Sequence, residues 1–380
     1  MASTTTEAYV ARASGISLEK VTYSPLAADE ILVDIVSASV CHSDVKAAQG
    51  TFHLQLPLIL GHEGAGYVKA IGSSVTYVQP GDAVVLTFTN CGKCRRCLSG
   101  KSPYCDDIFQ LNFSGKRENG EFPVRDAEGK AIHGLFFGQS SMSRIALVKQ
   151  NSAVKIEPKP ETREELKIFA ALGCGIQTGA GAILNIAHPP PSSTIAIFGA
   201  GAVGLSAVLA TLLSSPTSTI ILIDNSPTKL HHLLQALPIM QHVTTVDSTS
   251  TTPDSLSEHL KSLTPEGRGL DFALDCVGNS DVTRAAHMAL DKCGLLLNVG
   301  SSATARAEYT LASHLVRGIT VRGTHQGDSV SRVMVPHLIS LWRKGRFPFD
   351  GLLSEYKFQD LNQALEDMRA GRVVKPLLVL

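Results

Sequence analysis

The spacing of apolar positions changes near residue 155 and separates two kinds of predicted structure. Before that point, aliphatic and β-branched runs such as Glu30–Ala38 and Ala83–Thr87 are separated by turn residues such as Pro80-Gly81-Asp82. Runs that are bounded in this way predict strands. We therefore expect a β-rich first part, with a long surface excursion over the polar, glycine-containing stretch Asp106–Gly134.

From residue 161 the apolar spacing becomes helical. It predicts helices over Glu161–Leu172 and Ile176–Ala187, and three prolines at 189–191 end the second one. Short apolar strands then alternate with helical or loop material, which predicts a parallel sheet with helices on both faces and an α/β fold class. The expected strands are Thr194–Phe198, Thr219–Asp224, His242–Asp247, Leu270–Val277, Leu295–Val299 and Ile319–Arg322. Helices over Val330–Arg343 and Gln359–Ala370 and a strand over Val373–Leu380 follow.

One uncharged stretch, from Pro189 to Ile223, is long enough to cross a membrane. Glycines at 199, 201 and 204 interrupt it, so we expect a buried strand, a turn and a helix there instead. The first residues lack the basic and apolar segments of a secretory signal. We therefore expect a cytoplasmic protein with no membrane partner.

Composition restricts the function classes further. The chain has 380 residues, which corresponds to about two domains. Its 44% apolar content excludes disorder as the main state. The 34 basic and 34 acidic side chains balance, whereas a non-specific nucleic-acid binder carries a basic excess. We expect no nucleic-acid partner.

A glycine-rich turn, Gly199-Ala200-Gly201-Ala202-Val203-Gly204, fits the dinucleotide-binding pattern G-x-G-x-x-G. It follows an apolar strand and opens a helix, which is the context that the motif requires. Gly199 permits the tight turn, Gly201 lets a pyrophosphate approach the backbone, and Gly204 allows close packing of helix on sheet. Free N–H groups at the helix N-terminus attract phosphates. The alternative is a purely structural glycine turn.

Asp224 ends the next strand, twenty residues after Gly204. Its carboxylate can accept hydrogen bonds from an adenosine ribose and would repel a 2′-phosphate. The pattern therefore predicts NAD(H) rather than NADP(H) as the cofactor.

Four cysteines lie within fifteen residues, at Cys91, Cys94, Cys97 and Cys105. Four thiolates on short loops can converge on one tetrahedral ion and leave no open coordination position, which predicts a structural zinc site. A redox or iron–sulfur cluster is the alternative. A nucleic-acid-binding zinc ribbon is a further one, which the neutral charge balance argues against.

Three dispersed residues, Cys41, His62 and Cys174, have the composition of a catalytic zinc site with a fourth position open. Isolated buried cysteines and core histidines are common in proteins. The spacing of these three residues therefore leaves two interpretations open, a metal site and ordinary core packing. Three polar neighbours favour the metal site. Asp44 can orient the imidazole, Glu63 can approach the metal, and Ser43 can carry a proton.

Together these motifs resemble the zinc-dependent medium-chain alcohol dehydrogenase family, and the resemblance covers nearly the whole chain. It is carried by Cys41-His42-Ser43-Asp44, Gly61-His62-Glu63-Gly64-Ala65-Gly66, the four cysteines, Gly173-Cys174-Gly175, Gly199–Gly204 with Asp224, and Gly371–Lys375. Three segments are most similar to the aryl-alcohol (benzyl-alcohol) dehydrogenase branch: Leu172–Ala182, Gly327–Val330 and Gly345–Asp350.

The resemblance implies a GroES-like catalytic domain over residues 1–175 and 323–380 and a Rossmann NAD(H)-binding domain over 176–322. It also implies two zinc ions, a catalytic one on Cys41, His62 and Cys174 and a structural one on the four clustered cysteines. The residues implied to contact the cofactor are His42 and Lys375 at the pyrophosphate, Lys229 near the ribose, Thr178 and Val299 at the nicotinamide, and Gly199, Gly201, Ala202, Val203 and Gly204 in the turn. The implied substrate pocket is lined by Phe88, Phe136 and Phe137, with Thr87 as an alternative to Phe88.

One position departs from the family pattern. Many members carry a histidine three residues after the relay hydroxyl, as the outer proton carrier, and this chain has Lys46 there. An amine can pass a proton, but an ordinary lysine is charged near neutrality. Proton transfer through Ser43 can then end at Lys46 or at water.

The implied activity is hydride transfer between NAD(H) and a small-molecule primary alcohol or aldehyde, aromatic or allylic. The alternative is a zinc-retaining reductase of an activated carbonyl or a conjugated C=C bond in a biosynthetic pathway. A third reading, from another class, is a nucleotide-sensing regulator without catalysis. The resemblance also implies a homodimer or homotetramer joined at the edge of the Rossmann sheet, with Leu295–Val299 as the expected seam.

Overall fold

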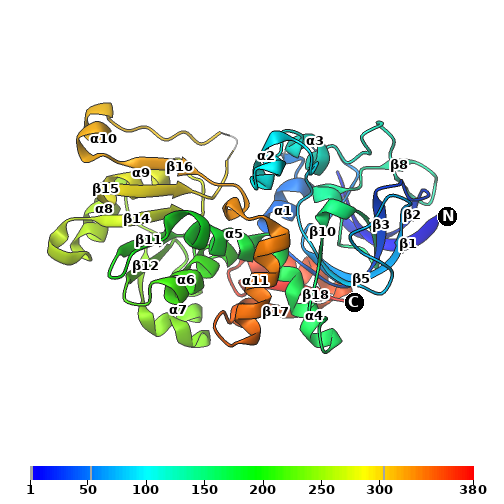
Figure 1. Cartoon of the computed structure of the whole chain (residues 1–380). Helices are drawn as coiled ribbons and strands as arrows, with labels where there is room; N and C mark the ends of the chain where they lie inside the picture. Colours follow the sequence, from blue (N-terminus) through cyan, green and yellow to red (C-terminus); the bar gives the residue numbers. More distant parts are fainter. Residues whose placement is uncertain (1–2, 52–53, 303) are drawn as a thin grey trace.

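A computed structural model describes residues 3–51, 54–302 and 304–380. In the described residues the strands form three sheets, with the parallel sheet at one end of the molecule and the other two at the opposite end (Figure 1). The parallel sheet has the order β13-β12-β11-β14-β15-β16. Its strands are β11 (Thr194–Phe198), β12 (Thr219–Asp224), β13 (Val243–Asp247), β14 (Leu270–Asp275), β15 (Leu290–Asn298) and β16 (Thr320–Gly323).

Alternate residues of the central strand β11 face opposite sides of this sheet. Ile195 and Ile197 share a core with residues of α6, whereas Ala196 and Phe198 share another with residues of α8 and α9. A strand that is buried on both faces reads as a continuous apolar run, which is why its sequence lacks alternation. The helices of this part are α6 (Ala202–Ser214), α7 (Pro227–Ala236), α8 (Pro253–Ser262), α9 (Ser280–Ala289) and α10 (Leu311–Arg317). The predicted parallel sheet is confirmed.

The order of the strands reverses between β11 and β14, on either side of the first strand of the sheet. In open parallel sheets, ligands bind outside the carboxyl ends of the strands at such a reversal. The glycine-rich turn lies at this point, directly after β11.

The β-rich part consists of two further sheets. The five-stranded sheet has the order β4-β1-β2-β7-β8 and the seven-stranded one β10-β6-β5-β3-β18-β17, with β9 paired to β3. Their strands are β1 (Thr4–Arg12), β2 (Gly15–Tyr23), β3 (Glu30–Ser39), β4 (Leu58–Ile59), β5 (Gly64–Ile71), β6 (Ala83–Leu86), β7 (Val124–Arg125), β8 (Ala131–Ile132), β9 (Ile145–Lys149), β10 (Ala153–Lys155), β17 (Leu353–Lys357) and β18 (Lys375–Val379). Strand β18 pairs antiparallel with β3, so segments from both ends of the chain build one sheet.

The stretch Asp106–Gly134 is more ordered than the sequence suggested. It contains the helix α3 (Ile108–Phe113) and the short strands β7 and β8, which extend the five-stranded sheet from β2. The stretch remains mostly exposed or half-buried, as expected of a surface excursion, but its short helix and strands were not predicted. Strands of two residues leave no alternation of apolar and polar positions to detect.

The remaining predicted helices are present with shifted ends. The first two are α4 (Arg163–Phe169), followed by a 3-10 turn over Ala170–Gly173, and α5 (Gly175–Gly181), which continues as a π-helical turn over Ala182–Ala187. The last two are α11 (Ser331–Arg343) and α12 (Leu361–Arg369). Three short helices lie in the first part: α1 (His42–Ala48), α2 (Arg95–Leu98) and α3.

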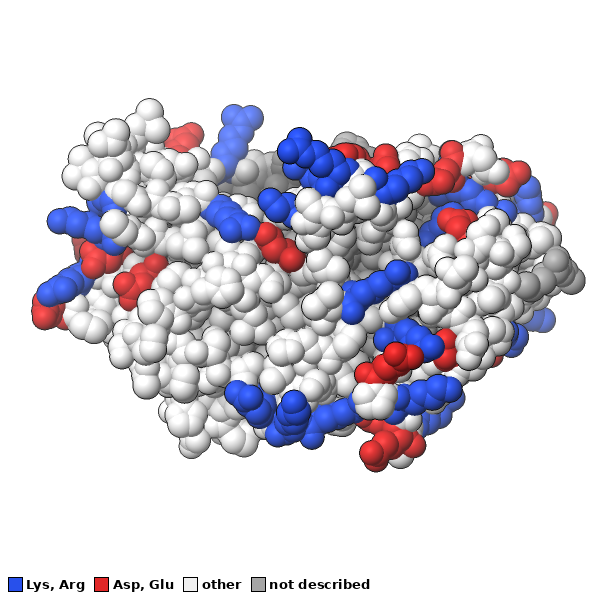
Figure 2. Space-filling model, in the orientation of Figure 1, with Lys and Arg blue, Asp and Glu red and all other residues white. Residues whose placement is uncertain are grey.

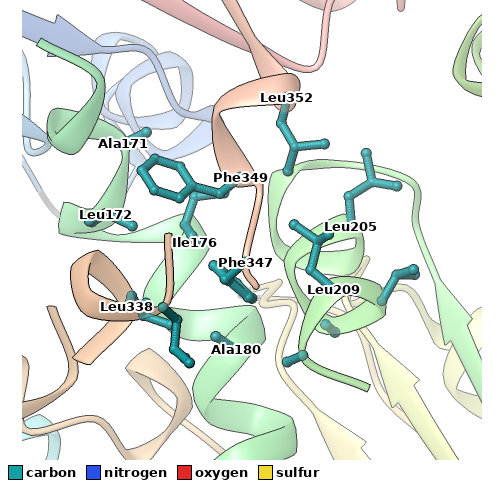
Figure 3. Close-up of a cluster of buried hydrophobic side chains, with 14 of the residues drawn as sticks. Ala171, Leu172, Ile176, Ala180, Leu205, Leu209, Leu338, Phe347, Phe349 and Leu352 are labelled. Carbon is teal, nitrogen blue, oxygen red and sulfur yellow. The ribbon is translucent and has the colours of Figure 1, made fainter. Parts of the chain in front are cut away.

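A buried apolar cluster joins α5, α6 and α11 where the two parts of the molecule meet (Figure 3). Figure 3 shows Phe347 and Phe349 inserted between these helices. Leu172 and Ile176, which flank Cys174 in sequence, belong to this cluster. The cluster therefore fixes the backbone on both sides of a predicted zinc ligand.

No single helix among the described residues is long and apolar enough to span a membrane. One helix pair, Arg163–Gly173 and Gly175–Ala187, reaches that length and composition only together, across a 62° bend. The uncharged stretch Pro189–Ile223 forms β11, α6 and most of β12, as expected.

Candidate metal and cofactor sites

Cys41, His62 and Cys174 come together although they lie on three separate segments. Cys41 caps the N-terminus of α1, His62 lies in the loop between β4 and β5, and Cys174 precedes α5. Their ligand atoms, with a carboxylate oxygen of Glu63, all lie within 4.8 Å of one another. The predicted convergence is therefore present in the structure.

The His62 ring is oriented by Asp44. Its Nδ1 lies 3.0 Å from Asp44 Oδ1, while the same carboxylate accepts the backbone N–H groups of Cys41 and Gly61. Burial disfavours a charged ring, but the Asp44 carboxylate and, to a smaller extent, Cys41 together outweigh burial and raise the pKa of His62 well above its usual range.

The other ring nitrogen, Nε2, is buried without a hydrogen-bond partner and belongs to the converged ligand set. A buried polar atom of this kind needs a partner. A carboxylate that fixes one nitrogen while the other faces two thiols is the arrangement of a metal-binding histidine. The donor set therefore fits zinc.

Glu63 and Lys375 form a fully buried ion pair beside this cluster. Lys375 Nζ lies 2.6 Å from Glu63 Oε2 and donates to the carbonyl of Val40, and Glu63 Oε1 accepts the N–H of Gly175. Burial raises the pKa of Glu63. Because Lys375 pairs with the Glu63 carboxylate, the ligand atoms left to hold an ion are those of Cys41, His62 and Cys174. The predicted pyrophosphate contact of Lys375 stays a prediction.

The three phenylalanines of the predicted substrate pocket belong to one apolar cluster, and two of them pack on His62. The ring of Phe137 stacks on His62 at a centroid distance of 4.6 Å, and Phe136 meets it edge-on at 5.4 Å. Phe137 has a φ of 53°, a conformation that costs energy for a residue with a side chain. Phe88 lies 6.1 Å from the ring of His325. All three are at most 5% exposed, so they can shape an apolar wall beside the metal site.

The predicted relay residues occupy α1. Ser43 lies in its first turn, directly after Cys41 and His42, and Lys46 lies in its last turn. Lys46 Nζ donates to the carbonyl of Ser301, in the loop after β15, at 2.8 Å. The Lys46 amine therefore joins the β-rich part to the parallel-sheet part.

The four clustered cysteines also converge, with all ligand atoms within 4.8 Å. Cys91 Sγ and Cys97 Sγ are 3.9 Å apart, close to the roughly 3.8 Å edge of a tetrahedron with Zn–S bonds of about 2.3 Å. Backbone N–H groups point at three of the sulfurs, those of Cys105, Cys91 and Cys94. The N–H of Asp106 contributes most to a lowered pKa of Cys94, about 6. This set fits a closed structural zinc site.

The glycine-rich turn has the geometry that the motif predicts. A Cβ at Gly204 would lie 1.9 Å from Gly199 O, so helix α6 packs tightly on the turn only with glycine. A Cβ at Gly201 would have no atom within 4 Å, which leaves the backbone open to an approaching group. Ala202 and Val203 open α6. The N-terminus of α6 can therefore receive a phosphate.

Asp224 ends β12 beside this turn. Its carboxylate accepts the N–H groups of Ala200 and Ser226 and pairs with Lys229 Nζ at 3.0 Å. The structure thus brings the two predicted ribose-side residues together. Val299 follows β15, and Thr178, on α5, donates to the carbonyl of Cys174.

Sequence reasoning missed Gln326, whose side-chain Nε2 lies 3.6 Å from Cys174 Sγ. The two residues are 152 positions apart, and a lone glutamine carries no metal-ligand signal. The Leu172–Ala182 and Gly327–Val330 segments were singled out, but nothing in their spacing places one against the other.

Comparisons with known proteins agree with this geometry. Residues 27–158 match the family described as Alcohol dehydrogenase GroES-like domain, and residues 202–341 match the family described as Zinc-binding dehydrogenase. A geraniol dehydrogenase from Castellaniella defragrans is 34% identical over 366 residues, covering 96% of this chain and 94% of that protein. An alcohol dehydrogenase class-3 from Myxine glutinosa is 34% identical over 373 residues, with the same two coverages.

Among solved structures, benzyl alcohol dehydrogenase from Acinetobacter calcoaceticus superposes with a TM-score of 0.89 at 33% identity, covering 99% of both chains. The fold class and the family expected from the motifs are confirmed. The candidate ligand residues converge, and the sequence identity to these relatives extends over nearly the whole chain. The chain therefore belongs to the zinc-dependent medium-chain alcohol dehydrogenase family of oxidoreductases.

Proposed function

We propose that the protein interconverts a primary alcohol, aromatic or allylic, and its aldehyde, with NAD(H) as the hydride carrier. The observation that carries this proposal is the buried set of Cys41, His62 and Cys174, with His62 Nε2 unpartnered and two phenylalanine rings against the same histidine. Two relatives are named for geraniol and benzyl alcohol, primary alcohols with unsaturation beside the carbinol carbon.

Cys41, His62 and Cys174 would hold a zinc ion that, when bound, acts as a Lewis acid toward the alcohol oxygen. Asp44 keeps His62 Nε2 aimed at that position, and the Lys375 ion pair keeps Glu63 from taking the place of a fourth ligand. Ser43 receives the proton of the alcohol, and Phe136 and Phe137 exclude water from one side.

In this proposal the carboxyl ends of β11 and β12 would bind the cofactor. The N-terminus of α6 takes the pyrophosphate, and His42 faces it from α1. Asp224 accepts the ribose hydroxyls and repels a 2′-phosphate, which favours NAD(H). Thr178 and Val299 flank the nicotinamide. We propose two domains, one formed by residues 1–175 and 323–380 and the other by residues 176–322, with the cofactor bound between them.

A substrate panel with purified protein and metal analysis tests the proposal. We expect NADH formation with benzyl and cinnamyl alcohol, the reverse with their aldehydes, and two zinc ions per chain. Reduction of the C=C bond of a conjugated enal, with the carbonyl left intact, would favour the reductase alternative. Absence of any cofactor oxidation or reduction by a protein carrying two zinc ions would contradict both.

A further inference from the structure

The segment between β16 and α11 forms a left-handed turn over Gln326, Gly327 and Asp328, with φ values of 55°, 60° and 53°. Such a conformation is unfavourable for residues with side chains and persists only where surrounding contacts enforce it. A Cβ at Gly181 of α5 would lie 2.3 Å from Gly327 O. The turn is therefore seated directly on α5, the helix that begins after Cys174.

This seating buries the Gln326 side chain, which is 5% exposed, against the metal site. Its Oε1 accepts from Gln177 Nε2 at 3.3 Å and lies 3.4 Å from Thr178 Oγ1, whose proton is given to the carbonyl of Cys174. With the oxygen end facing the Gln177 amide, the N–H₂ of Gln326 points the other way, to Cys174 Sγ at 3.6 Å.

The turn is also tied to the four-cysteine lobe. Tyr104, which directly precedes Cys105, donates its hydroxyl to Asp328 Oδ1 at 2.6 Å. His325 Nδ1 lies 2.8 Å from the carbonyl of Pro103. The predicted structural zinc lobe therefore contacts both sides of Gln326.

We propose that Gln326 is a positioning residue for the catalytic metal: its amide donates to the Cys174 thiolate and orients that sulfur toward the ion. This inference rests on the proposed zinc site. An N–H···S bond lowers the energy of the sulfur lone pairs and fixes the thiolate direction. Outer partners of metal ligands commonly contribute 10- to 100-fold to metal affinity.

Two substitutions separate the sulfur contact from the packing of the turn. Gln326→Glu keeps an oxygen for Gln177 and Thr178 but places a carboxylate where the N–H donor lay. Gln326→Met removes the donor without adding charge. Asn185→Leu is the matched control, because Asn185 Nδ2 donates to Gly327 O at 2.9 Å and holds the same turn without touching Cys174.

The measurements are zinc affinity, by competition with a chromophoric chelator, and the thiolate-to-metal charge-transfer absorption after cobalt(II) replaces the catalytic zinc. We expect both Gln326 variants to bind zinc about tenfold more weakly and to move the cobalt band to longer wavelength, with Asn185→Leu near wild type. Wild-type affinity and spectrum in Gln326→Met, or the same shift in Asn185→Leu, would overturn the inference.

The wild-type protein separates this inference from the proposed function. If cobalt(II) added to a wild-type chain that keeps its structural zinc gives no thiolate–cobalt band, the catalytic zinc site is absent, and the proposed function with it. A normal wild-type band that the Gln326 variants leave in place removes only the role of Gln326.

Discussion

Some side chains at the site are candidate metal ligands, and others hold these ligands or their neighbours in place. Asp44 holds His62, Lys375 holds Glu63, and Cys41 and Cys174 complete the donor set. Removing a donor therefore affects chemistry more than folding, since the surrounding hydrogen bonds come mostly from the backbone and from Asp44.

We expect Cys41→Ser to lower kcat/KM for alcohol oxidation by roughly 10³-fold or more, because Lewis-acid activation supplies several kcal/mol of transition-state stabilisation. The melting temperature should stay near that of wild type. Steady-state NADH formation and thermal unfolding measure both effects. Cys293→Ser, at an exposed cysteine, is the control. Wild-type turnover in Cys41→Ser would remove this cysteine from the active site.

Asp224→Ala should shift the ratio of kcat/KM for NADP(H) over NAD(H) upward by about tenfold or more. The substitution removes a like charge from the 2′-phosphate position and frees Lys229, whose amine lies 3.0 Å from the carboxylate. Asp224→Asn serves as the control, since it keeps an acceptor for the N–H of Ala200. An unchanged ratio in both variants would count against the ribose contact.

At the level of elements, the four-cysteine lobe is a short segment with little core of its own. The α2 helix that it encloses contains no buried residue. A metal ion can supply the folding energy that such a segment lacks.

Cys97→Ser should therefore lower the melting temperature by at least about 5 °C and release about one zinc ion per chain, as loss of a structural metal is a strongly destabilising change. Differential scanning calorimetry and metal analysis test this. Because the lobe contacts the turn that carries Gln326, some loss of catalytic zinc should follow on heating. A normal melting temperature with full zinc content would contradict the structural role.

Short-range patterns predicted the elements and much of the site. The Gly199–Gly204 turn and the four cysteines are local motifs, so their spacing alone predicted their geometry. The Lys46–Ser301 and Gln326–Cys174 contacts join residues 255 and 152 positions apart, and only the fold brings them together. The strands β7 and β8 were missed because each is too short to show a period.

On the scale of the whole molecule, the Lys46–Ser301 hydrogen bond joins the two parts across the proposed cofactor cleft. We expect Lys46→Met to raise the dissociation constant of NADH about two- to tenfold, the effect of one hydrogen bond, and to leave the pH profile of kcat unchanged. Fluorescence titration and pH–rate measurements test this, with Lys46→Arg as control. A shifted pH profile with unchanged NADH affinity would instead make Lys46 a proton carrier.

The expected oligomer cannot use Leu295–Val299 as its edge seam, because β15 is paired on both sides, with β14 and β16. The edge strand on that side of the sheet is β16, and helix α10, which precedes it, exposes Leu311, Leu315 and Val316, each at least 74%. An edge strand beside exposed apolar side chains is typical of a protein–protein contact.

We therefore expect a homodimer or homotetramer through this edge, and a lower mass for Leu315→Glu in light scattering. Leu234→Glu, at an exposed leucine on α7, is the matched control. A wild-type protein that is monomeric at micromolar concentration would contradict this expectation.

One face of the molecule carries charged side chains of both signs. On the face seen in Figure 2, lysine and arginine side chains are interspersed with aspartate and glutamate. A duplex-binding surface would gather the basic groups on one face.

Because β18 pairs with β3, the sheet that contains both strands cannot be complete until β18 has been synthesised. Residues 375–379 leave the ribosome after the whole parallel-sheet segment, yet Lys375 is the buried partner of Glu63, which follows His62. The parallel-sheet segment is complete in the nascent chain well before this strand emerges, and domains commonly fold as they are synthesised. The cluster of Cys41, His62, Glu63 and Cys174 thus reaches its final form only after β18 has been synthesised, when the parallel sheet beside it has already left the ribosome.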